Sequence, residues 1–200
     1  MLYRIVNFLA RMVFFSLYPR KVTGQDQMPA QGPVIVVCNH KYFFDVFNLT
    51  TIFGRRLTFM AKKELFQNRI LGALIRRYGA FPVDRDGNDL AAIRSAMAVL
   101  KKDGVLAIFP EGTRSHGIVL GELKQGVALI AQKSGAQILP VYINHTDRIF
   151  ARMQVHVGAP FTLPPTTRAD AAYLAASMET VREKMLALCD APAVLEEKRA

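Results

Sequence analysis

Hydrophobic residues in this chain form short continuous runs separated by longer segments with helical spacing. Short apolar runs bounded by Gly, Pro or polar residues are typical of buried strands. They predict strands at Val34–Cys38 and at residues 80–83, 105–109, 138–143 and 154–158, with a further short candidate at residues 22–23. The segments between these runs predict helices near residues 43–53, 63–78, 86–102, 124–133 and 169–189.

This alternation of strands and helices predicts the fold class. Strands that alternate with helices over 200 residues favour a single α/β domain. We expect a mixed, mostly parallel sheet flanked by helices, within a domain that spans residues 22–190. The charged residues 191–200 are expected to form a frayed tail.

The first 21 residues have a different pattern, because they are largely apolar and contain no acidic residue. Arg4 and Arg11 lie roughly 20° apart on a helical wheel, so they mark one edge of an apolar helix. Charges interrupt the run too often for a membrane span of about 20 apolar residues, and Arg11 splits the core of any signal peptide. The pattern favours an amphipathic membrane-anchoring helix over residues 1–21, and a helix that packs on the protein core is the alternative.

The composition limits the choice of partners. The formal net charge is +10, but the basic residues are scattered and no nucleic-acid-binding motif is visible. An anionic membrane surface or an anionic substrate explains this charge, and no nucleic-acid partner is predicted. The two cysteines lie in apolar contexts typical of reduced thiols. The four histidines show no metal-ligand spacing, so neither a metal nor another cofactor is predicted.

A candidate acid–base pair follows the first long apolar run. His40 and Asp45 would lie about 140° apart on a regular helix, so they meet only if the chain turns between them. Residues 39–41 suit such a turn, and a helix beginning near Tyr42 would place Asp45 in its first turn. Asp45 would then fix the tautomer of His40, whose other ring nitrogen takes a proton from a hydroxyl group. The alternatives are a turn in which Asp45 only caps a helix, and Cys38 as a nucleophile.

A candidate anion site follows a second apolar run, at residues 109–115 with the sequence FPEGTRS. Pro110 ends the strand, and Gly112 permits close approach of the backbone to a ligand. The planar guanidinium of Arg114 suits phosphate oxygens, and Glu111 would accept from a hydroxyl group or hold an arginine. Arg85 follows a further apolar segment. The alternative is a surface loop whose Arg–Glu pair contributes little.

These segments, in this order, resemble the glycerophospholipid acyltransferases, in particular the 1-acylglycerol-3-phosphate (lysophosphatidate) acyltransferases. Residues 39–45 match the N-H-x-x-x-x-D block of that family, and residues 109–115 match its F-P-E-G-T-R-S block. Residues 79–85 resemble its second block and residues 139–141 its fourth. Residues 61–65 and 124–126 lie where the family has basic motifs, and the resemblance covers about residues 22–160.

The resemblance implies roles for individual residues. His40 would be the general base and Asp45 its orienting partner. The residues implied in substrate binding are Arg85, Glu111, Gly112, Thr113 and Arg114 for the glycerol phosphate, together with Asn39 and Lys62. Backbone N–H groups of residues 41–43 are expected to stabilise the tetrahedral intermediate.

The implied reaction moves an acyl chain from acyl-CoA or acyl carrier protein to the 2-hydroxyl of lysophosphatidate. The product would be phosphatidate, made in phospholipid biosynthesis by a peripheral or monotopic enzyme on the cytoplasmic face of the cell membrane. Another lysophospholipid or a lyso-ornithine lipid is an alternative acceptor. A hydrolase is a second alternative, which Arg85 and Arg114 disfavour. A non-catalytic binding module is a third, and it leaves His40 and Asp45 unexplained.

Overall fold

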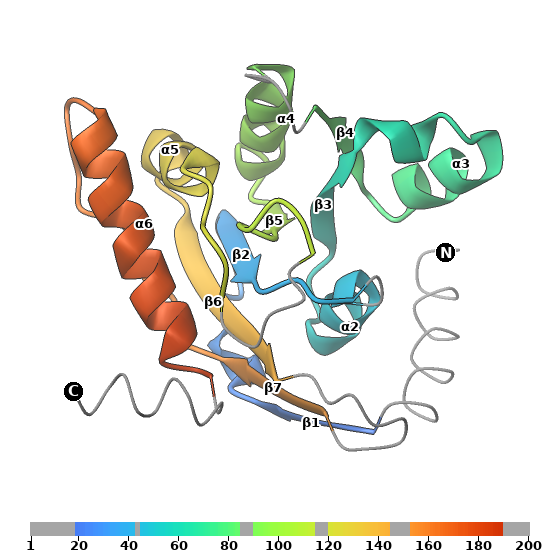
Figure 1. Ribbon diagram of the computed structural model, residues 1–200, viewed down its shortest axis with the longest axis horizontal. Helices are drawn as coiled ribbons and strands as arrows, with labels where there is room; N and C mark the ends of the chain where they lie inside the picture. The colour runs from blue at the N-terminus through green and yellow to red at the C-terminus, as the bar shows by residue number, and fades with distance from the viewer. Residues whose placement is uncertain (1–18, 43–44, 85–89, 115–119, 145–152, 190–200) are drawn as a thin grey trace.

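A seven-stranded sheet forms the centre of the protein in a computed structural model (Figure 1). The structure describes residues 19–42, 45–84, 90–114, 120–144 and 153–189. The strands are β1 (Arg20–Thr23), β2 (Val34–Cys38), β3 (Leu57–Lys62), β4 (Phe81–Val83), β5 (Val105–Ile108), β6 (Gln137–Asn144) and β7 (Met153–Val157). Their order in the sheet is β1-β7-β6-β2-β5-β3-β4. Neighbours pair in parallel except β6 and β7, which are antiparallel. The predicted mixed, mostly parallel sheet is confirmed.

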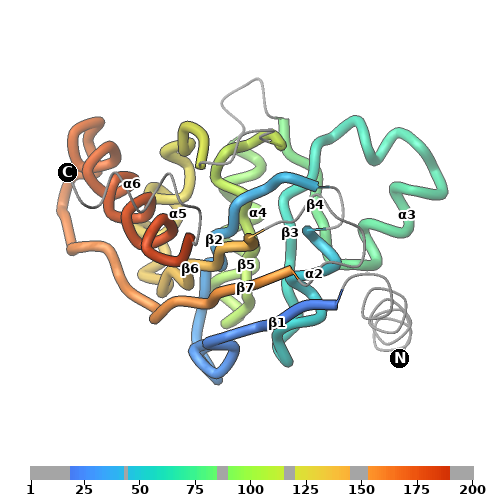
Figure 2. The backbone as a smooth tube through the Cα atoms, turned by 60° about the horizontal axis from the view of Figure 1, so that its bottom comes forward, coloured from blue at the N-terminus to red at the C-terminus, as the bar shows by residue number. Residues whose placement is uncertain are grey.

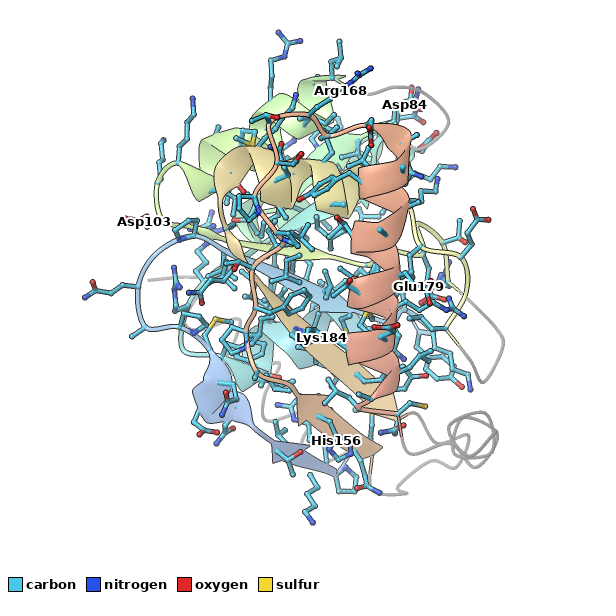
Figure 3. The ribbon with its side chains drawn as sticks, turned by 90° about the vertical axis from the view of Figure 1, so that its left-hand side faces the viewer. Asp84, Asp103, His156, Arg168, Glu179 and Lys184 are labelled. Carbon is cyan, nitrogen blue, oxygen red and sulfur yellow. The ribbon has the colours of Figure 1, made fainter. Side chains whose placement is uncertain are left out.

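Helices cover both faces of this sheet. The helices are α2 (Asp45–Ile52), α3 (Arg69–Arg77), α4 (Leu90–Leu100), α5 (Gly126–Ser134) and α6 (Ala171–Leu186), with short 3-10 helices η1 (Gln25–Gln27) and η2 (Lys63–Phe66). Helices α4, α5 and α6 share one hydrophobic core with one face of the sheet, and α2 packs on the other face. Figure 2 shows α5 and α6 together beside β6, whereas α3 stands at the opposite end of the sheet. The outer face of α6 is polar, with Glu179 and Lys184 exposed (Figure 3).

The central strand β2 shows why the sheet forms where the sequence predicts it. All five of its residues are fully buried, and it lies between β5 and β6. A parallel strand with both faces covered needs apolar side chains on both sides, so it appears in the sequence as a continuous apolar run. Val34–Cys38 is such a run of mostly β-branched residues.

Strand β3 was not among the predicted elements. Leu57 and Phe59 are buried, whereas Thr58 and Met60 are partly exposed, so its pattern is a short alternation next to two arginines. The strand is stabilised by parallel pairing with β5, which lies far along the chain. The other predicted strands and helices that fall within the described residues are confirmed to within a few residues.

The predicted N-terminal helix is wrong at its carboxyl end. Arg20 and Lys21 belong to β1, which pairs with Met153 and Gln154 of β7 at the edge of the sheet. The Arg20 guanidinium donates to Asn48 Oδ1 at 3.1 Å, which connects β1 to α2. Residues 1–18 and the predicted tail at 191–200 lie outside the described residues. Among the helices that the structure describes, none is long and apolar enough to cross a membrane.

The parallel strands bring the candidate residues to one edge of the sheet. Strands β2, β5, β3 and β4 all run in the same direction, so their carboxyl ends meet at this edge. His40 follows β2, residues 109–114 follow β5, and Lys62 ends β3. Ligands of open α/β sheets bind in the crevice at this edge.

Candidate active site

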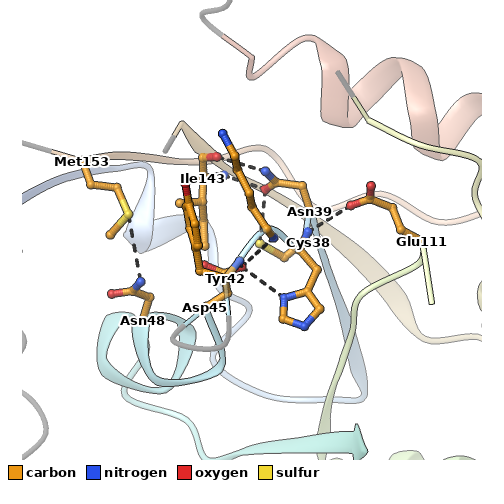
Figure 4. Close-up of polar contacts among 10 residues, drawn as sticks. Cys38, Asn39, Tyr42, Asp45, Asn48, Glu111, Ile143 and Met153 are labelled. Atoms are coloured by element: carbon orange, nitrogen blue, oxygen red, sulfur yellow. Dashed lines mark hydrogen bonds and ion pairs between the residues drawn. The ribbon is translucent and has the colours of Figure 1, made fainter. Parts of the chain in front are cut away.

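His40 and Asp45 form the hydrogen-bonded pair that the sequence predicts. His40 Nδ1 lies 3.1 Å from Asp45 Oδ2, and the two side chains are 11% and 1% exposed. The chain turns after β2, and Asp45 is the first residue of α2 (Figure 4). An ionised Asp45 accepts the proton of Nδ1, so Nε2 of the neutral imidazole is left as a proton acceptor. The pair therefore has the arrangement of a general base and its orienting carboxylate.

Asp45 also organises the turn that carries His40. Its Oδ2 accepts from the backbone N–H groups of Lys41 and Tyr42, both at 2.8 Å. This corrects one prediction, because these two N–H groups were expected to stabilise an oxyanion and are instead directed at a buried carboxylate. Phe43, the third expected donor, lies outside the described residues. The oxyanion donors are therefore not Lys41 and Tyr42 in this arrangement.

Phe109 fixes the plane of the His40 ring. The two rings stack with centroids 4.0 Å apart and planes inclined by 20°. Phe109 directly follows β5, the neighbour of β2 in the sheet. This contact limits rotation of the imidazole, so the hydrogen bond to Asp45 and the position of Nε2 are set together. The sequence placed Phe109 at the end of a strand, but it gave no sign of this contact.

Glu111 connects the loop after β2 with the segment around Gly121 by accepting from their backbone N–H groups. Its carboxylate is buried, with Oε1 accepting from the His40 N–H at 3.0 Å and Oε2 accepting from the Gly121 N–H at 3.1 Å. Glu111 was expected to contact a substrate hydroxyl or an arginine. In the structure it holds the backbone of the candidate base, and any contact with substrate stays a prediction.

Asn39 has a similar positioning role on the other side of His40. Its amide nitrogen donates to the Ile143 carbonyl at 3.0 Å, and its amide oxygen accepts from the Ile143 N–H at 2.8 Å. The side chain therefore pairs with β6 as a strand backbone would, just beyond the end of β2 (Figure 4). The predicted contact of Asn39 with substrate stays a prediction.

Cys38 does not have the properties of a nucleophile. It is fully buried on β2, and burial raises the pKa of its thiol well above the ordinary value. The negative charges of Asp45 and Glu111 raise that pKa further. Because the thiolate is the reactive form, a thiol held in its protonated state is inert at neutral pH.

Gly112 and Lys124 form the floor of the candidate anion site. Gly112 has a φ of 73°, in the left-handed region that favours glycine. A Cβ at this position would lie 2.7 Å from Lys124 Cε, so the lysine stem rests on the glycine. The Lys124 N–H donates to the Pro110 carbonyl at 2.9 Å, which fixes the lysine beside the loop. Lys124 was not among the predicted site residues, although residues 124–126 had been noted as a basic segment.

The remaining predicted residues that the structure describes are exposed. Thr113 and Arg114 are exposed and follow Gly112 directly. Lys62 is exposed at the end of β3, with Nζ 3.7 Å from Glu64 Oε1. Arg85 lies outside the described residues. The structure thus brings Thr113 and Lys124 to one pocket, which Glu111, Gly121 and Glu122 also line, and Arg114 follows Thr113 directly.

An apolar cavity of about 330 Å³ opens next to this cluster. Its volume is at the lower end of the range for ligand pockets. Phe109 lines the cavity and also stacks on His40, so the cavity adjoins the candidate base. The other lining residues are Met60, Val83, Asp84, Ala92, Ile93, Ile108, Pro110, Gly112, Lys124, Gly126, Val127 and Ile130. The site therefore combines a candidate base, the cationic side chain of Lys124 and apolar space.

Curated sequences resemble this chain over more than half of its length. A 1-acyl-sn-glycerol-3-phosphate acyltransferase of Bacillus subtilis (strain 168) is 36% identical over 121 residues, which are 60% of this chain and 60% of that protein. The enzyme of the same name from Streptococcus pneumoniae (strain R6) is 41% identical over 119 residues, which are 58% of this chain and 44% of that protein. The chain thus covers less than two thirds of the length of either relative.

A solved structure has the same fold. The crystal structure of the 1-acyl-sn-glycerophosphate (LPA) acyltransferase PlsC from Thermotoga maritima superposes with a TM-score of 0.71 at 24% sequence identity. The likeness covers 99% of this chain and 80% of that one. The family model named Acyltransferase matches residues 19–144, which hold most of the sheet together with His40, Asp45 and the loop after β5. Since this match spans more than half of the sequence, the chain belongs to the Acyltransferase family.

Proposed function

We propose that the protein transfers an acyl chain from an acyl thioester to the 2-hydroxyl of 1-acylglycerol 3-phosphate, forming phosphatidate. The observation that carries this proposal is the His40–Asp45 hydrogen bond at the carboxyl edge of the sheet. The relatives from B. subtilis and S. pneumoniae are named for this acceptor, which supports the choice of substrate. The protein has no need of its own nucleophile, because the acceptor brings a hydroxyl group and Cys38 is buried.

The proposed mechanism uses His40 as base and then as acid. Nε2 of His40 takes the proton of the 2-hydroxyl as its oxygen attacks the thioester carbonyl, giving a tetrahedral intermediate and an imidazolium. Asp45 stabilises that imidazolium through Nδ1–H. The intermediate collapses by breaking the carbon–sulfur bond, and the imidazolium returns the proton to the departing thiolate. The products are phosphatidate and the free thiol of coenzyme A or acyl carrier protein.

The loop after β5 supplies the proposed site for the acceptor phosphate. Arg114 offers a planar pair of donors, Thr113 offers a hydroxyl, and Lys124, whose stem packs on Gly112, offers an ammonium. Arg85 is proposed to join them. Cationic side chains suit a dianionic phosphate, whereas transfer of the acyl chain to water would not require them.

The release of free thiol from palmitoyl-CoA tests this function. Purified protein in detergent is expected to release coenzyme A quickly only when 1-acylglycerol 3-phosphate is present. A parallel reaction with palmitoyl-acyl carrier protein distinguishes the two donors. Thiol release at the same rate with and without acceptor would instead identify a hydrolase. Other lysophospholipids and a lyso-ornithine lipid complete the panel of acceptors.

Replacing the proposed phosphate-binding cations is expected to weaken acceptor binding. Arg114→Gln and Lys124→Met should each raise the KM for lysophosphatidate by about tenfold to a hundredfold, because a hydrogen bond to a charged group contributes about 1.5–3 kcal/mol. The KM for the acyl donor should change far less. Arg168→Gln is the matched control, since Arg168 is an exposed arginine before α6 (Figure 3). If the KM for lysophosphatidate were unchanged in both site variants, Arg114 and Lys124 would not belong to the acceptor site.

Cys38→Ala is expected to retain most of the turnover. The thiol is buried and protonated, and alanine keeps the strand apolar at the cost of about 1 kcal/mol of stability for the small space it leaves. The measurement is kcat for acyl transfer, with the melting temperature as a check on the fold. Loss of acyl transfer in a folded Cys38→Ala variant would contradict this expectation and support Cys38 as the nucleophile.

A further inference from the structure

Helix α3 exposes large apolar side chains that the proposed chemistry does not use. Ile70 is 84% exposed and Leu74 is 45% exposed, and nearby Leu65 of η2 is 37% exposed. On a helix, Ile70 and Leu74 lie about 40° apart, so they form one stripe. A contiguous exposed apolar surface on a small protein is typical of an interaction site.

The helix is firmly held, so this exposure is not the result of a frayed end. Asn68 caps it by accepting from the N–H groups of Ile70 and Leu71 at 3.1 and 3.0 Å. On its inner side, a Cβ at Gly72 would lie 2.8 Å from the Phe66 carbonyl oxygen, so α3 and η2 are in direct backbone contact. Ile70 and Leu74 therefore face away from the protein on a well-defined element.

Basic residues surround the apolar stripe. Arg69 precedes Ile70, and Arg76 and Arg77 end the helix, all three exposed. Lys62 and Lys63 lie just before it, and Glu64 is the sole acidic residue between positions 62 and 77. Arg76 also lies over the Phe66 ring, with Cζ 4.7 Å from the ring centroid. Exposed apolar residues flanked by arginines are the pattern of a helix that lies in the headgroup region of a bilayer.

The position of α3 fits this pattern. Segment η2–α3 begins at the carboxyl end of β3, the edge of the sheet that carries His40. Figures 1 and 2 show α3 projecting beyond β3 and β4 at the end of the molecule. A bilayer touching α3 would therefore lie close to the edge at which the acceptor binds.

We propose that Leu65, Ile70 and Leu74, together with Arg69, Arg76 and Arg77, form a docking surface for an anionic lipid bilayer. The inference deepens the proposed function, because it places the site next to the membrane that holds a lysophospholipid. It is distinct from the predicted helix at residues 1–21. A bilayer fits better than an acidic carrier protein, since the apolar side chains form a stripe of their own and the cations flank it at both ends.

Vesicle sedimentation of the full chain tests the surface. Ile70→Ser/Leu74→Ser is expected to lower partitioning onto vesicles of phosphatidylcholine and phosphatidylglycerol by at least about tenfold, because two large apolar side chains leave the interface. Arg76→Gln/Arg77→Gln should lower it by about fivefold for each arginine, and only when phosphatidylglycerol is present. Leu90→Ser is the matched control, since Leu90 of α4 is 67% exposed and lies apart from this stripe.

Three results would overturn the proposal. The first is vesicle partitioning of the Ile70→Ser/Leu74→Ser variant equal to that of Leu90→Ser. The second is a lower melting temperature with unchanged partitioning, which would mean that another part of the chain covers the stripe. The third is unchanged partitioning with slower transfer from acyl carrier protein alone, which would make the stripe a protein-docking surface.

Acyl transfer to detergent-solubilised lysophosphatidate separates this proposal from the function itself. The α3 variants are expected to keep wild-type turnover in detergent, where no bilayer has to be reached. If the wild-type protein transfers no acyl chain, the proposed function fails, and the sedimentation result still stands as a test of the docking surface.

Discussion

His40→Gln is expected to lower kcat for acyl transfer by about a thousandfold, the contribution typical of a well-placed general base. Glutamine keeps the backbone N–H that donates to Glu111, so the loop after β2 retains that hydrogen bond. Its amide cannot take the proton of the acceptor hydroxyl at neutral pH. The measurement is kcat from thiol release at saturating lysophosphatidate, with circular dichroism to verify the fold.

His156→Gln provides the control for this variant. His156 lies on β7 (Figure 3), where its Nδ1 is 2.7 Å from the Thr23 hydroxyl, and β6 separates this strand from β2. Its loss should leave kcat within about twofold of the wild-type value, because it has no part in the proposed proton transfer. A folded His40→Gln protein with more than a tenth of the wild-type kcat would exclude His40 as the base.

The local part of the site was predictable from the sequence. His40 and Asp45 are five residues apart, and one turn followed by one helix start is enough to bring them together. The prediction of the oxyanion donors from the same segment was wrong for Lys41 and Tyr42. The N–H groups of Lys41 and Tyr42 were expected to face the substrate, but the Asp45 carboxylate is the nearer acceptor and is buried. A buried carboxylate needs hydrogen-bond donors, and the nearest donors to Asp45 are these two N–H groups. They are therefore bound to Asp45 and do not point toward the substrate.

The contacts that hold His40 in place join distant parts of the chain and were not predictable. Glu111 is 71 residues from His40, and Asn39 is 104 residues from Ile143. These contacts depend on which strands are neighbours in the sheet. The order of the strands cannot be predicted from a local sequence pattern. Strand β3 was missed for the same reason, because its stability comes from pairing with β5.

Local and distant contacts together hold His40 in place. Glu111 accepts from the backbone of His40, Phe109 stacks on its ring, and Asp45 accepts from its Nδ1. The proposed base is therefore fixed at its backbone, its ring plane and its tautomer. A base held in this way needs little reorganisation when the substrate arrives, which is how a supporting shell increases the rate of a reaction. In this view the first role of Glu111 is to position His40.

Asp45→Asn is expected to lower kcat by about a hundredfold or more while the protein stays folded. The carboxylate accepts from His40 Nδ1 and from the N–H groups of Lys41 and Tyr42. An asparagine oxygen can still satisfy the two backbone donors, so the turn is kept. The negative charge that stabilises the imidazolium is lost, and the tautomer of His40 is no longer fixed.

Asp45→Ala separates the catalytic role from the structural one. It removes the acceptor for the two partly buried N–H groups of Lys41 and Tyr42, and an unsatisfied buried donor costs about 1–3 kcal/mol. This variant should therefore lose about 1–3 kcal/mol of unfolding free energy in urea, whereas Asp45→Asn loses much less. Both variants should lose activity. If Asp45→Asn retained nearly full kcat, Asp45 would be only a helix cap, and the charge of the carboxylate would have no part in moving the proton.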